Sequence, residues 1–251
     1  MSGIDPVQLT AFDLSGKKRP RPLLTQNSRL KTIGVKNWSL PALAARLQDG
    51  RTVKTCPAAG VCAQICYALQ GTYQYPNVKE RHIENLAYVL EDLNGWARAM
   101  RNELSRSSGN WIRIHDAGDF FSREYLIAWL SIMRARPHVN FYCYTKEVAL
   151  FKELVEPDKP PNFKFVYSLG GREDGLLNLA VDRVADVFPT EADIEPAGFH
   201  SQKGNDLLAV TGPAPVGMAA NNIPKFKKRQ GRMRLSEWQE LANTRRPRGP
   251  R

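Results

Sequence analysis

The feature that most constrains the fold is an alternation of strand and helix patterns between residues 111 and 188. Short segments rich in β-branched and aromatic residues recur at intervals of up to about thirty residues, with helical patterns between them. Strands joined in this way by helices form right-handed crossovers and a parallel sheet. The sequence therefore predicts an α/β fold with a mostly parallel sheet. The strands are expected at 111–114, 139–144, 163–168 and 184–188, and the helices at 122–136 and 148–155.

The chain divides into three parts by pattern. Residues 1–37 show neither a helical nor a strand period and contain three prolines, which predicts an N-terminal arm. Residues 38–210 hold the alternating segments and a long helical pattern at 77–105, and they form the expected α/β domain. Residues 211–251 form a basic C-terminal extension without a fold signature of their own.

Composition excludes several classes of protein. Hydrophobic residues make up 42% of the chain, which is typical of a globular protein. No apolar stretch approaches the roughly 20 residues that a membrane-spanning helix needs. The first residues lack the basic and apolar segments of a secretory signal. We therefore expect a cytoplasmic protein that does not contact a membrane.

Positive charge is concentrated near the C-terminus. The chain carries a net charge of +11, and residues 221–251 alone hold ten basic and two acidic residues, a net +8. Such blocks attract polyanions, so we expect DNA or RNA as a possible partner. A solubilising tail without a partner explains the same charge equally well. The residues expected to contact nucleic acid are Lys225, Lys227, Lys228, Arg229, Arg232 and Arg234.

The strongest chemical motif is a cluster of cysteines in one short loop. Cys56, Cys62 and Cys66 fall within eleven positions, while Cys143 lies far away. A tight group of thiols in a reducing compartment is typical of a metal or redox site rather than of a disulfide framework. Cys62 and Cys66 are four residues apart, so one helical turn would place both on one face. The sequence predicts a metal site in this loop.

Three close thiols without a second pair favour an iron–sulfur cluster, expected to be of the 4Fe–4S type, over structural zinc. Zinc remains an alternative, and a third reading is that the thiols are simply small buried residues. A fourth ligand would come from Cys143, His115 or His82, or one iron would stay open.

Further candidate residues follow the predicted strands. His115 and Asp119 follow the strand at 111–114, and the carboxyl ends of parallel strands carry the chemistry of α/β folds. We predict catalytic roles for both; the alternatives are that His115 satisfies a buried carbonyl and Asp119 caps the next helix. Gly170 and Gly171 are expected to bind an anionic cofactor, although a plain turn accounts for them as well. Gly118 is expected to bind a cofactor only through the more distant resemblance described below.

Three motifs in order carry a family resemblance. Thr-Cys-Pro…Cys…Cys-Tyr-Ala from residue 55, Arg-Ile-His-Asp-Ala-Gly-Asp-Phe from residue 113 and Phe-Tyr-Cys-Tyr-Thr-Lys from residue 141 resemble a phage and actinobacterial family called gene product 88. The resemblance covers roughly residues 25–190. Proteins of this family have no assigned activity, so the resemblance implies a phage-type protein in a host cytoplasm and adds little chemistry.

More distantly, the layout is similar to radical S-adenosylmethionine enzymes. In that superfamily, three cysteines in the loop after the first strand hold a 4Fe–4S cluster whose open iron binds S-adenosylmethionine. Gly118-Asp119 occupies the place of the motif that ends the second strand there, although the cysteine spacing here is wider. The resemblance implies an incomplete (β/α) barrel of about five or six strands with the cluster loop at its carboxyl rim.

Two classes of function follow from these observations. The protein is either an enzyme whose open iron binds a cofactor or a substrate, with nucleic acid or another anion as the substrate. Alternatively it is a non-catalytic nucleic-acid-binding protein with a structural or redox-sensing cluster. A cavity beside the cysteines would favour the enzyme, and a fourth protein ligand in a closed site would favour the second class.

Overall fold

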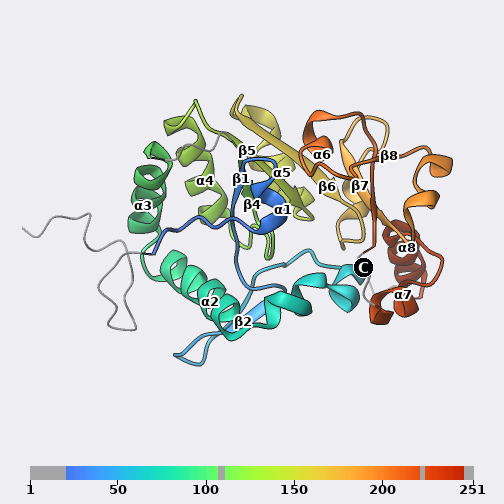
Figure 1. Ribbon diagram of the computed structural model, residues 1–251, viewed down its shortest axis with the longest axis horizontal. Helices are drawn as coiled ribbons and strands as arrows, with labels where there is room; N and C mark the ends of the chain where they lie inside the picture. Colours follow the sequence, from blue (N-terminus) through green and yellow to red (C-terminus); the bar gives the residue numbers. More distant parts are fainter. Residues whose placement is uncertain (1–20, 107–110, 221–223, 246–251) are drawn as a thin grey trace, which may run out of the picture.

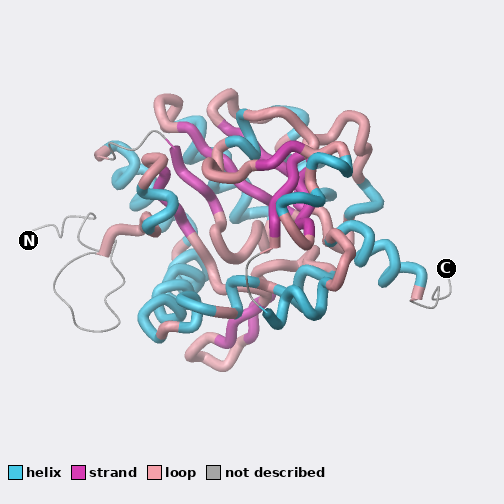
Figure 2. Tube along the Cα trace, turned by 45° about the vertical axis from the view of Figure 1, so that its right-hand side comes forward, coloured by secondary structure: helices cyan, strands magenta, loops and turns pink. Residues whose placement is uncertain are grey.

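The computed structural model describes residues 21–106, 111–220 and 224–245. Its centre is a seven-stranded sheet in the order β1-β4-β5-β6-β7-β9-β8, and Figure 2 shows these strands side by side with helices around them. Every neighbouring pair in this sheet is parallel. The strands are β1 (Val35–Trp38), β4 (Trp111–Ile114), β5 (Asn140–Thr145), β6 (Phe163–Ser168), β7 (Val184–Phe188), β8 (His200–Ser201) and β9 (Val216–Ala219).

The predicted α/β class and parallel sheet are confirmed, but the expected strand count is corrected. Seven strands are present rather than five or six, and the outer strands β1 and β8 are not paired with each other. The described sheet is therefore open and does not close into a barrel. From β1 through β4, β5, β6 and β7 to β9, neighbours follow chain order. Right-handed crossovers then place the connecting helices on the same face.

That face carries the larger hydrophobic core. The helices α2 (Pro76–Glu91), α3 (Leu93–Ser105), α4 (Arg123–Ala135) and α5 (Val148–Leu154) pack against it. Trp96 lies at its centre, fully buried, with its ring 5.6 Å from that of Trp38 and 5.2 Å from that of Trp129. Tyr125 of α4 accepts a hydrogen bond from Nε1 of Trp38 at 2.8 Å. Burial of these rings contributes most of the core's stability.

The opposite face of the sheet has a smaller apolar cluster. Two short helices, α1 (Ser28–Lys31) and α6 (Leu208–Thr211), cover it through Leu30, Ala209 and Val210. Because side chains alternate along a strand, Tyr142 and Tyr144 of β5 lie on this face while Cys143 points into the helix-covered core. The uncovered part of the face, toward the carboxyl ends of the strands, is where the cavity described below opens.

The sheet extends past both boundaries expected from the sequence. β1 lies almost wholly within residues assigned to the N-terminal arm, and β9 lies within those assigned to the C-terminal extension. The helical pattern predicted at 77–105 is two helices rather than one. Asp92 breaks it and caps α3, accepting a hydrogen bond from the N–H of Gly95 at 2.7 Å. No helix in the described ranges combines the length and apolar surface of a membrane span.

The C-terminal extension folds back onto the body. Helices α7 (Pro224–Gln230) and α8 (Leu235–Thr244) lie beside the segment that contains the cysteines, as Figure 1 shows at the red end of the chain. Phe226 and Leu235 are buried there against Val61 and Ile65. Between β1 and the cysteines, strands β2 (Ala44–Arg46) and β3 (Thr52–Lys54) form a separate antiparallel hairpin.

The start of α4 gives a direct test of helix capping. Ser122, predicted as the N-cap, accepts a hydrogen bond from the N–H of Tyr125 at 3.3 Å. We expect Ser122→Ala to lower the free energy of unfolding by about 1 kcal/mol, because one N–H of the first turn loses its partner. Ser131→Ala, at an exposed position in the middle of the same helix, should be neutral or slightly stabilising. Urea unfolding curves measure both, and equal losses for the two variants would contradict the prediction.

Candidate metal and ligand site

A cavity of about 740 Å³ opens at the carboxyl ends of the strands. Its wall includes residues that follow β4, β5 and β9, the last residue of β6, the cysteine segment and one side chain each from α7 and α8. This is the edge at which open parallel sheets bind ligands. The placement agrees with the expected position of the cysteine loop at the carboxyl rim.

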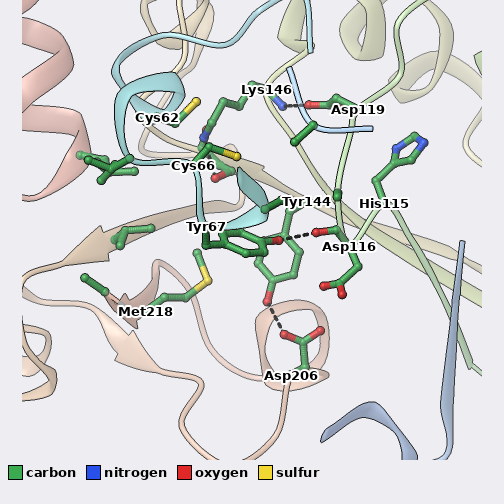
Figure 3. A pocket seen from close by; sticks show the side chains of 18 of the residues that line it. Cys62, Cys66, Tyr67, His115, Asp116, Asp119, Tyr144, Lys146, Asp206 and Met218 are labelled. Atoms are coloured by element: carbon green, nitrogen blue, oxygen red, sulfur yellow. Dashed lines mark hydrogen bonds between the residues drawn. The ribbon is translucent and has the colours of Figure 1, made fainter. Parts of the chain in front are cut away.

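All three clustered cysteines line this one cavity. Cys56 follows the hairpin, Cys62 lies in the 3-10 helix η2 (Val61–Ile65), and Cys66 ends that helix. Each is a free thiol and only partly exposed. Figure 3 shows Cys62 and Cys66 near each other at the side of the cavity opposite to His115. The loop thus presents its three thiols to one shared cavity.

Backbone hydrogen bonds fix the cysteine loop to the end of β6. The N–H of Cys62 donates to the carbonyl of Gly170 at 3.4 Å, and the N–H of Arg172 donates to the carbonyl of Ala58 at 2.8 Å. Ala59 and Gly171 form an isolated antiparallel bridge. These contacts hold a segment without regular strands in one conformation.

The C-terminal helices fix the loop from the other side. Gln239 of α8, 3% exposed, accepts a hydrogen bond from the N–H of Val61 at 2.8 Å. Arg229 of α7 donates to the carbonyl of Gln64 at 2.7 Å. Ser236 donates to the fully buried carboxylate of Asp186 on β7, at 2.5 Å. The basic extension is therefore part of the cysteine site's support, a role that its charge alone did not reveal.

Burial makes two of the three thiols weaker acids. It raises the pKa of Cys56, with a further increase from the nearby Asp119 carboxylate, and it raises the pKa of Cys66 as well.

Within residues 21–106, 111–220 and 224–245, no three side chains of His, Cys, Asp or Glu converge closely enough to hold one metal ion. A tetrahedral zinc ion with Zn–S bonds of about 2.3 Å would require such convergence.

The candidates for a fourth ligand lie away from the cysteines. Cys143 is fully buried in the helix-covered core, on the face opposite to the cavity. His82 lies on α2 against Tyr73 and does not line the cavity, and burial lowers its pKa to about 4. His115 borders the cavity, but Nε2 is 2.9 Å from the hydroxyl of Tyr125. Neither Cys143 nor His82 is placed to complete a site with the three thiols.

His115 has an unusual backbone that explains its orientation. Its φ of 65° lies in the left-handed region, which non-glycine residues rarely adopt. The turn carries the ring toward the core, where it packs edge-on against Phe120 at 4.6 Å. Burial lowers its pKa to about 3, and Nδ1 has no hydrogen-bond partner in the described part of the chain. His115 is thus a neutral residue packed into the wall, and its catalytic role stays a prediction.

Asp119 organises the strand ends beneath the loop. Its carboxylate accepts hydrogen bonds from the hydroxyl of Thr145 at 2.8 Å and from the N–H of Lys146 at 2.9 Å. Its own N–H donates to the carbonyl of Thr55, next to Cys56. These contacts connect β4, β5 and the cysteine loop. The geometry thus gives Asp119 a positioning role, and the predicted catalytic role remains untested.

The predicted glycine sites prove to be points of close packing. Gly118 (φ 83°) has Leu40 so near that a Cβ would approach it to 2.7 Å, and Gly170 (φ 91°) lies equally close to Leu235 of α8. The N–H groups of Gly170 and Gly171 both donate to the carboxylate of Asp174, at 2.7 and 2.9 Å. These N–H groups are not free to bind an anionic cofactor. The contacts therefore favour the alternative reading, in which Gly170 and Gly171 simply form a turn.

Comparison with known proteins places the chain in a family. A family model described as gene product 88 matches residues 18–246, which is most of the sequence. The chain belongs to the gene product 88 family. The resemblance carried by the three motifs is thereby confirmed, and the match extends into the C-terminal helices that support the cysteine loop.

A relative comes from a bacteriophage. The Gene 88 protein of Mycobacterium phage L5 is 28% identical over 126 residues, which are 46% of this chain and 49% of the relative. The match thus spans about half the length of the curated relative. No solved structure matches the chain. Similarity to radical S-adenosylmethionine enzymes therefore stays a prediction from the sequence.

This member of the gene product 88 family also has a buried polar network that sequence reasoning missed. Arg113 of β4 forms ion pairs with Asp116 at 3.1 Å and with Asp206 at 3.2 Å, and its guanidinium lies 5.0 Å from the ring centre of Tyr144. Asp206 also accepts hydrogen bonds from the hydroxyls of Tyr144 and Tyr142. Figure 3 shows Tyr144 and Asp206 together below the cysteines. No local motif marks Asp206, which folding brings from a distant loop.

A second missed residue is Glu147, which lies under the cysteine loop. It is 6% exposed and accepts a hydrogen bond from the N–H of Ala58 at 2.9 Å. Burial, and then the neighbouring charge of Asp119, raise the pKa of Glu147 from 4.5 to about 8. The position of Lys146-Glu147 directly after β5 was the available signal.

Glu147 predicts a pH-dependent stability. Between pH 4.5 and 8 the folded protein keeps a proton that the unfolded chain has lost, so the free energy of unfolding falls as pH rises. We expect Glu147→Gln to be close to wild type near pH 5 and to be more stable by about 4 kcal/mol at pH 8. Glu80→Gln, at an exposed position on α2, should follow the wild-type profile. Thermal melts across this pH range measure the stability difference between Glu147→Gln and wild type. A difference that does not change with pH would contradict the prediction.

Proposed function

We propose that this protein holds a 4Fe–4S cluster through Cys56, Cys62 and Cys66 and binds a ligand in the adjoining cavity. The proposed class is a radical S-adenosylmethionine-like enzyme acting on nucleic acid or another anionic substrate. The observation that carries the proposal is that three thiols from one short loop line a single cavity at the carboxyl ends of a parallel sheet. Thiolates in compact runs are the usual ligands of such clusters.

The donor set fits a cluster better than a single ion. Three free thiols border the cavity, and they do not converge on one point within the described residues. A polynuclear cluster is larger than an ion and takes its cysteines at separate corners. The raised pKa values of Cys56 and Cys66 indicate that the metal must help to displace the thiol protons.

The position of the other candidate ligands supports an open coordination site. Cys143 points into the core and His82 lies outside the cavity, so neither competes for a fourth iron. The free volume beside the thiols leaves room for a small molecule, with S-adenosylmethionine as the candidate. When bound, the cluster would supply an electron and one open position. The chain's own residues would hold the loop, orient the ligand and exclude water.

Polar side chains on the cavity wall give the ligand its contacts. Tyr144, Arg113 and Asp206 form one hydrogen-bonded group below the cysteines, and all three line the cavity. A buried arginine held by two carboxylates stays charged and fixed in position. Such a preorganised group orients a ligand with little further ordering. Catalytic roles for His115 and Asp119 are retained in the proposal as untested expectations.

Nucleic acid is the proposed macromolecular substrate because basic side chains lie beside the site. Lys227, Lys228, Arg229 and Arg232 are exposed on or next to α7, the helix that contacts the cysteine loop. Arg234 is partly buried and reaches Asp186 and Glu237, so it is less available. The side chain of Lys225 lies outside the described part of the structure. The remaining charges give a non-specific electrostatic surface for DNA or RNA.

The decisive experiment is anaerobic purification with analysis of iron, sulfide and zinc. The proposal expects a brown protein with about four irons and four sulfides per chain, and a broad absorbance that dithionite bleaches. A colourless protein with one zinc per chain would overturn it. Reductive cleavage of added S-adenosylmethionine would support the enzyme. A reduced cluster that leaves S-adenosylmethionine intact and unbound would favour the non-catalytic class.

The basic surface makes a separate prediction. We expect Lys227→Glu, Lys228→Glu and Arg232→Glu together to weaken binding to a fluorescent single-stranded oligonucleotide at least about tenfold, and to flatten its salt dependence, because fewer phosphate contacts form. Lys79→Glu, Arg98→Glu and Lys164→Glu together, all exposed on other elements, form the matched control with the same change in net charge. Anisotropy titrations at several salt concentrations measure the effect. Equal losses in the two variants would indicate that only total charge matters.

A further inference from the structure

Lys146 holds a positive charge in a fixed position beside the cysteines, and no ion pair involves it among the described residues. It follows β5, and its ammonium donates to the carbonyl of Ser168 at 2.7 Å, to the hydroxyl of Ser168 at 2.8 Å and to the carbonyl of Leu169 at 2.8 Å. Figure 3 shows its side chain along the same part of the cavity wall as Cys62 and Cys66. Three neutral oxygens therefore hold the ammonium in place without neutralising it.

No carboxylate among the described residues forms an ion pair with Lys146. Asp119 is adjacent, but it accepts a hydrogen bond from the backbone N–H of Lys146 rather than from the ammonium. Arg113, another cation on the cavity wall, is already paired with Asp116 and Asp206. The carboxylates of Asp119 and Asp174 interact with Lys146 through space, but neither forms a direct ion pair with its ammonium. A partly buried ammonium without a direct ion pair still attracts an anion in the space that it faces.

The cysteines, which line the same cavity as Lys146, are a second source of negative charge. Thiols must lose their protons to bind soft metals. Three thiolates then place several negative charges close together in a poorly solvated cavity, where they repel one another. A cation held on the same wall offsets part of this charge. Its three hydrogen bonds to neutral oxygens are made in advance, so little side-chain entropy is lost when metal binds.

We propose that Lys146 is the countercharge of the cysteine site and stabilises the thiolate–metal group that forms there. This inference rests on the proposed metal site, but it does not require iron or S-adenosylmethionine. Lys146 is a positioning residue, since it acts on the metal through the charge of the thiolates. Its effect extends to the electron affinity of a bound cluster, because one-electron reduction adds negative charge near the ammonium.

The test separates charge from hydrogen bonding. Lys146→Gln removes the charge and keeps two donors for the oxygens of Ser168 and Leu169, whereas Lys146→Arg keeps the charge. Metal-free protein is titrated anaerobically with Cd²⁺, which two of the thiolates can bind with solvent completing its coordination, and thiolate–metal absorbance is followed. We expect the dissociation constant to rise about tenfold in Lys146→Gln and to be largely restored in Lys146→Arg. Where a cluster is assembled, its reduction potential should become more negative in Lys146→Gln.

Circular dichroism and thermal melts show whether each variant folds. Lys159→Gln is the matched control, because Lys159 also donates to a carbonyl, that of Phe163, but does not line the cavity. Unchanged Cd²⁺ affinity in a folded Lys146→Gln would overturn the inference, even if wild type holds iron. Weakened Cd²⁺ binding in Lys146→Gln together with an iron-free wild type would support the inference and overturn the proposed function. An equal loss of Cd²⁺ affinity in Lys146→Gln and Lys146→Arg would show that Lys146 has a structural role, and it would overturn the proposed role as a countercharge.

Discussion

Replacing Cys56, Cys62 or Cys66 singly by alanine is expected to remove nearly all iron and sulfide from anaerobically purified protein. Each thiol lines the same cavity, and the remaining cysteine, Cys143, points into the helix-covered core instead. A cluster held by three cysteines loses a corner ligand in each variant, and the remaining ligands exchange with solvent thiols and chelators. Iron and acid-labile sulfide assays, with the visible spectrum, give the result directly.

Cys143→Ala is the matched control for these variants. Cys143 is also a free cysteine, but it is fully buried in the helix-covered core. Its replacement should lower the free energy of unfolding by about 1 kcal/mol through a small cavity and leave the iron content at the wild-type level. Iron that survives in the Cys62→Ala variant but disappears in Cys143→Ala would contradict the assignment of ligands.

The second large effect is expected at Gly60, where the cysteine loop meets the C-terminal helix. A Cβ at this position would lie 2.0 Å from Oε1 of Gln239 and 2.6 Å from the carbonyl oxygen of Gly170. The first contact would displace the side chain that binds the N–H of Val61, and the second involves backbone that cannot move freely. Gly60→Ala should therefore lower the free energy of unfolding by about 3 kcal/mol and reduce iron content.

Gly175→Ala provides the comparison for Gly60→Ala. Nothing lies within 4 Å of a Cβ built on Gly175, so the same chemical change meets open space there. We expect it to be neutral or slightly stabilising, because alanine restricts the unfolded chain. Urea unfolding and iron analysis of the two variants form the measurement. A Gly60→Ala protein with wild-type stability would show that α8 does not press on the loop as described.

Local patterns predicted the central strands well. The strands β6 and β7 begin and end where their apolar segments do, and Ser122 caps α4 as its sequence indicated. In each case the deciding forces act within a few residues of the chain: side-chain alternation, capping and turn chemistry. The cysteine loop was also found, because three thiols in one short segment need no tertiary information to be recognised.

Tertiary contacts decided what the sequence did not reveal. β1 and β9 are short, and they are strands because the edges of an existing sheet pair with them. Asp206 joins the cavity through Arg113 of β4 from 93 residues away. The orientation of Cys143 follows from which face of β5 the helices cover. Charge suggested a tail for residues after 220, whereas Phe226 and Leu235 dock that segment on the body.

The hydrogen bond between Val61 and Gln239 has a consequence for how the protein is made. The two residues are 178 positions apart in the chain. During synthesis, which proceeds from the N-terminus at about 5–20 residues per second, the cysteines emerge roughly ten to forty seconds before α8 can close over them. During that time the thiols lack the contact with α8 that supports their loop in the folded protein. A nascent chain stalled before Gln239 should therefore react faster with alkylating reagents at Cys62 than the released protein.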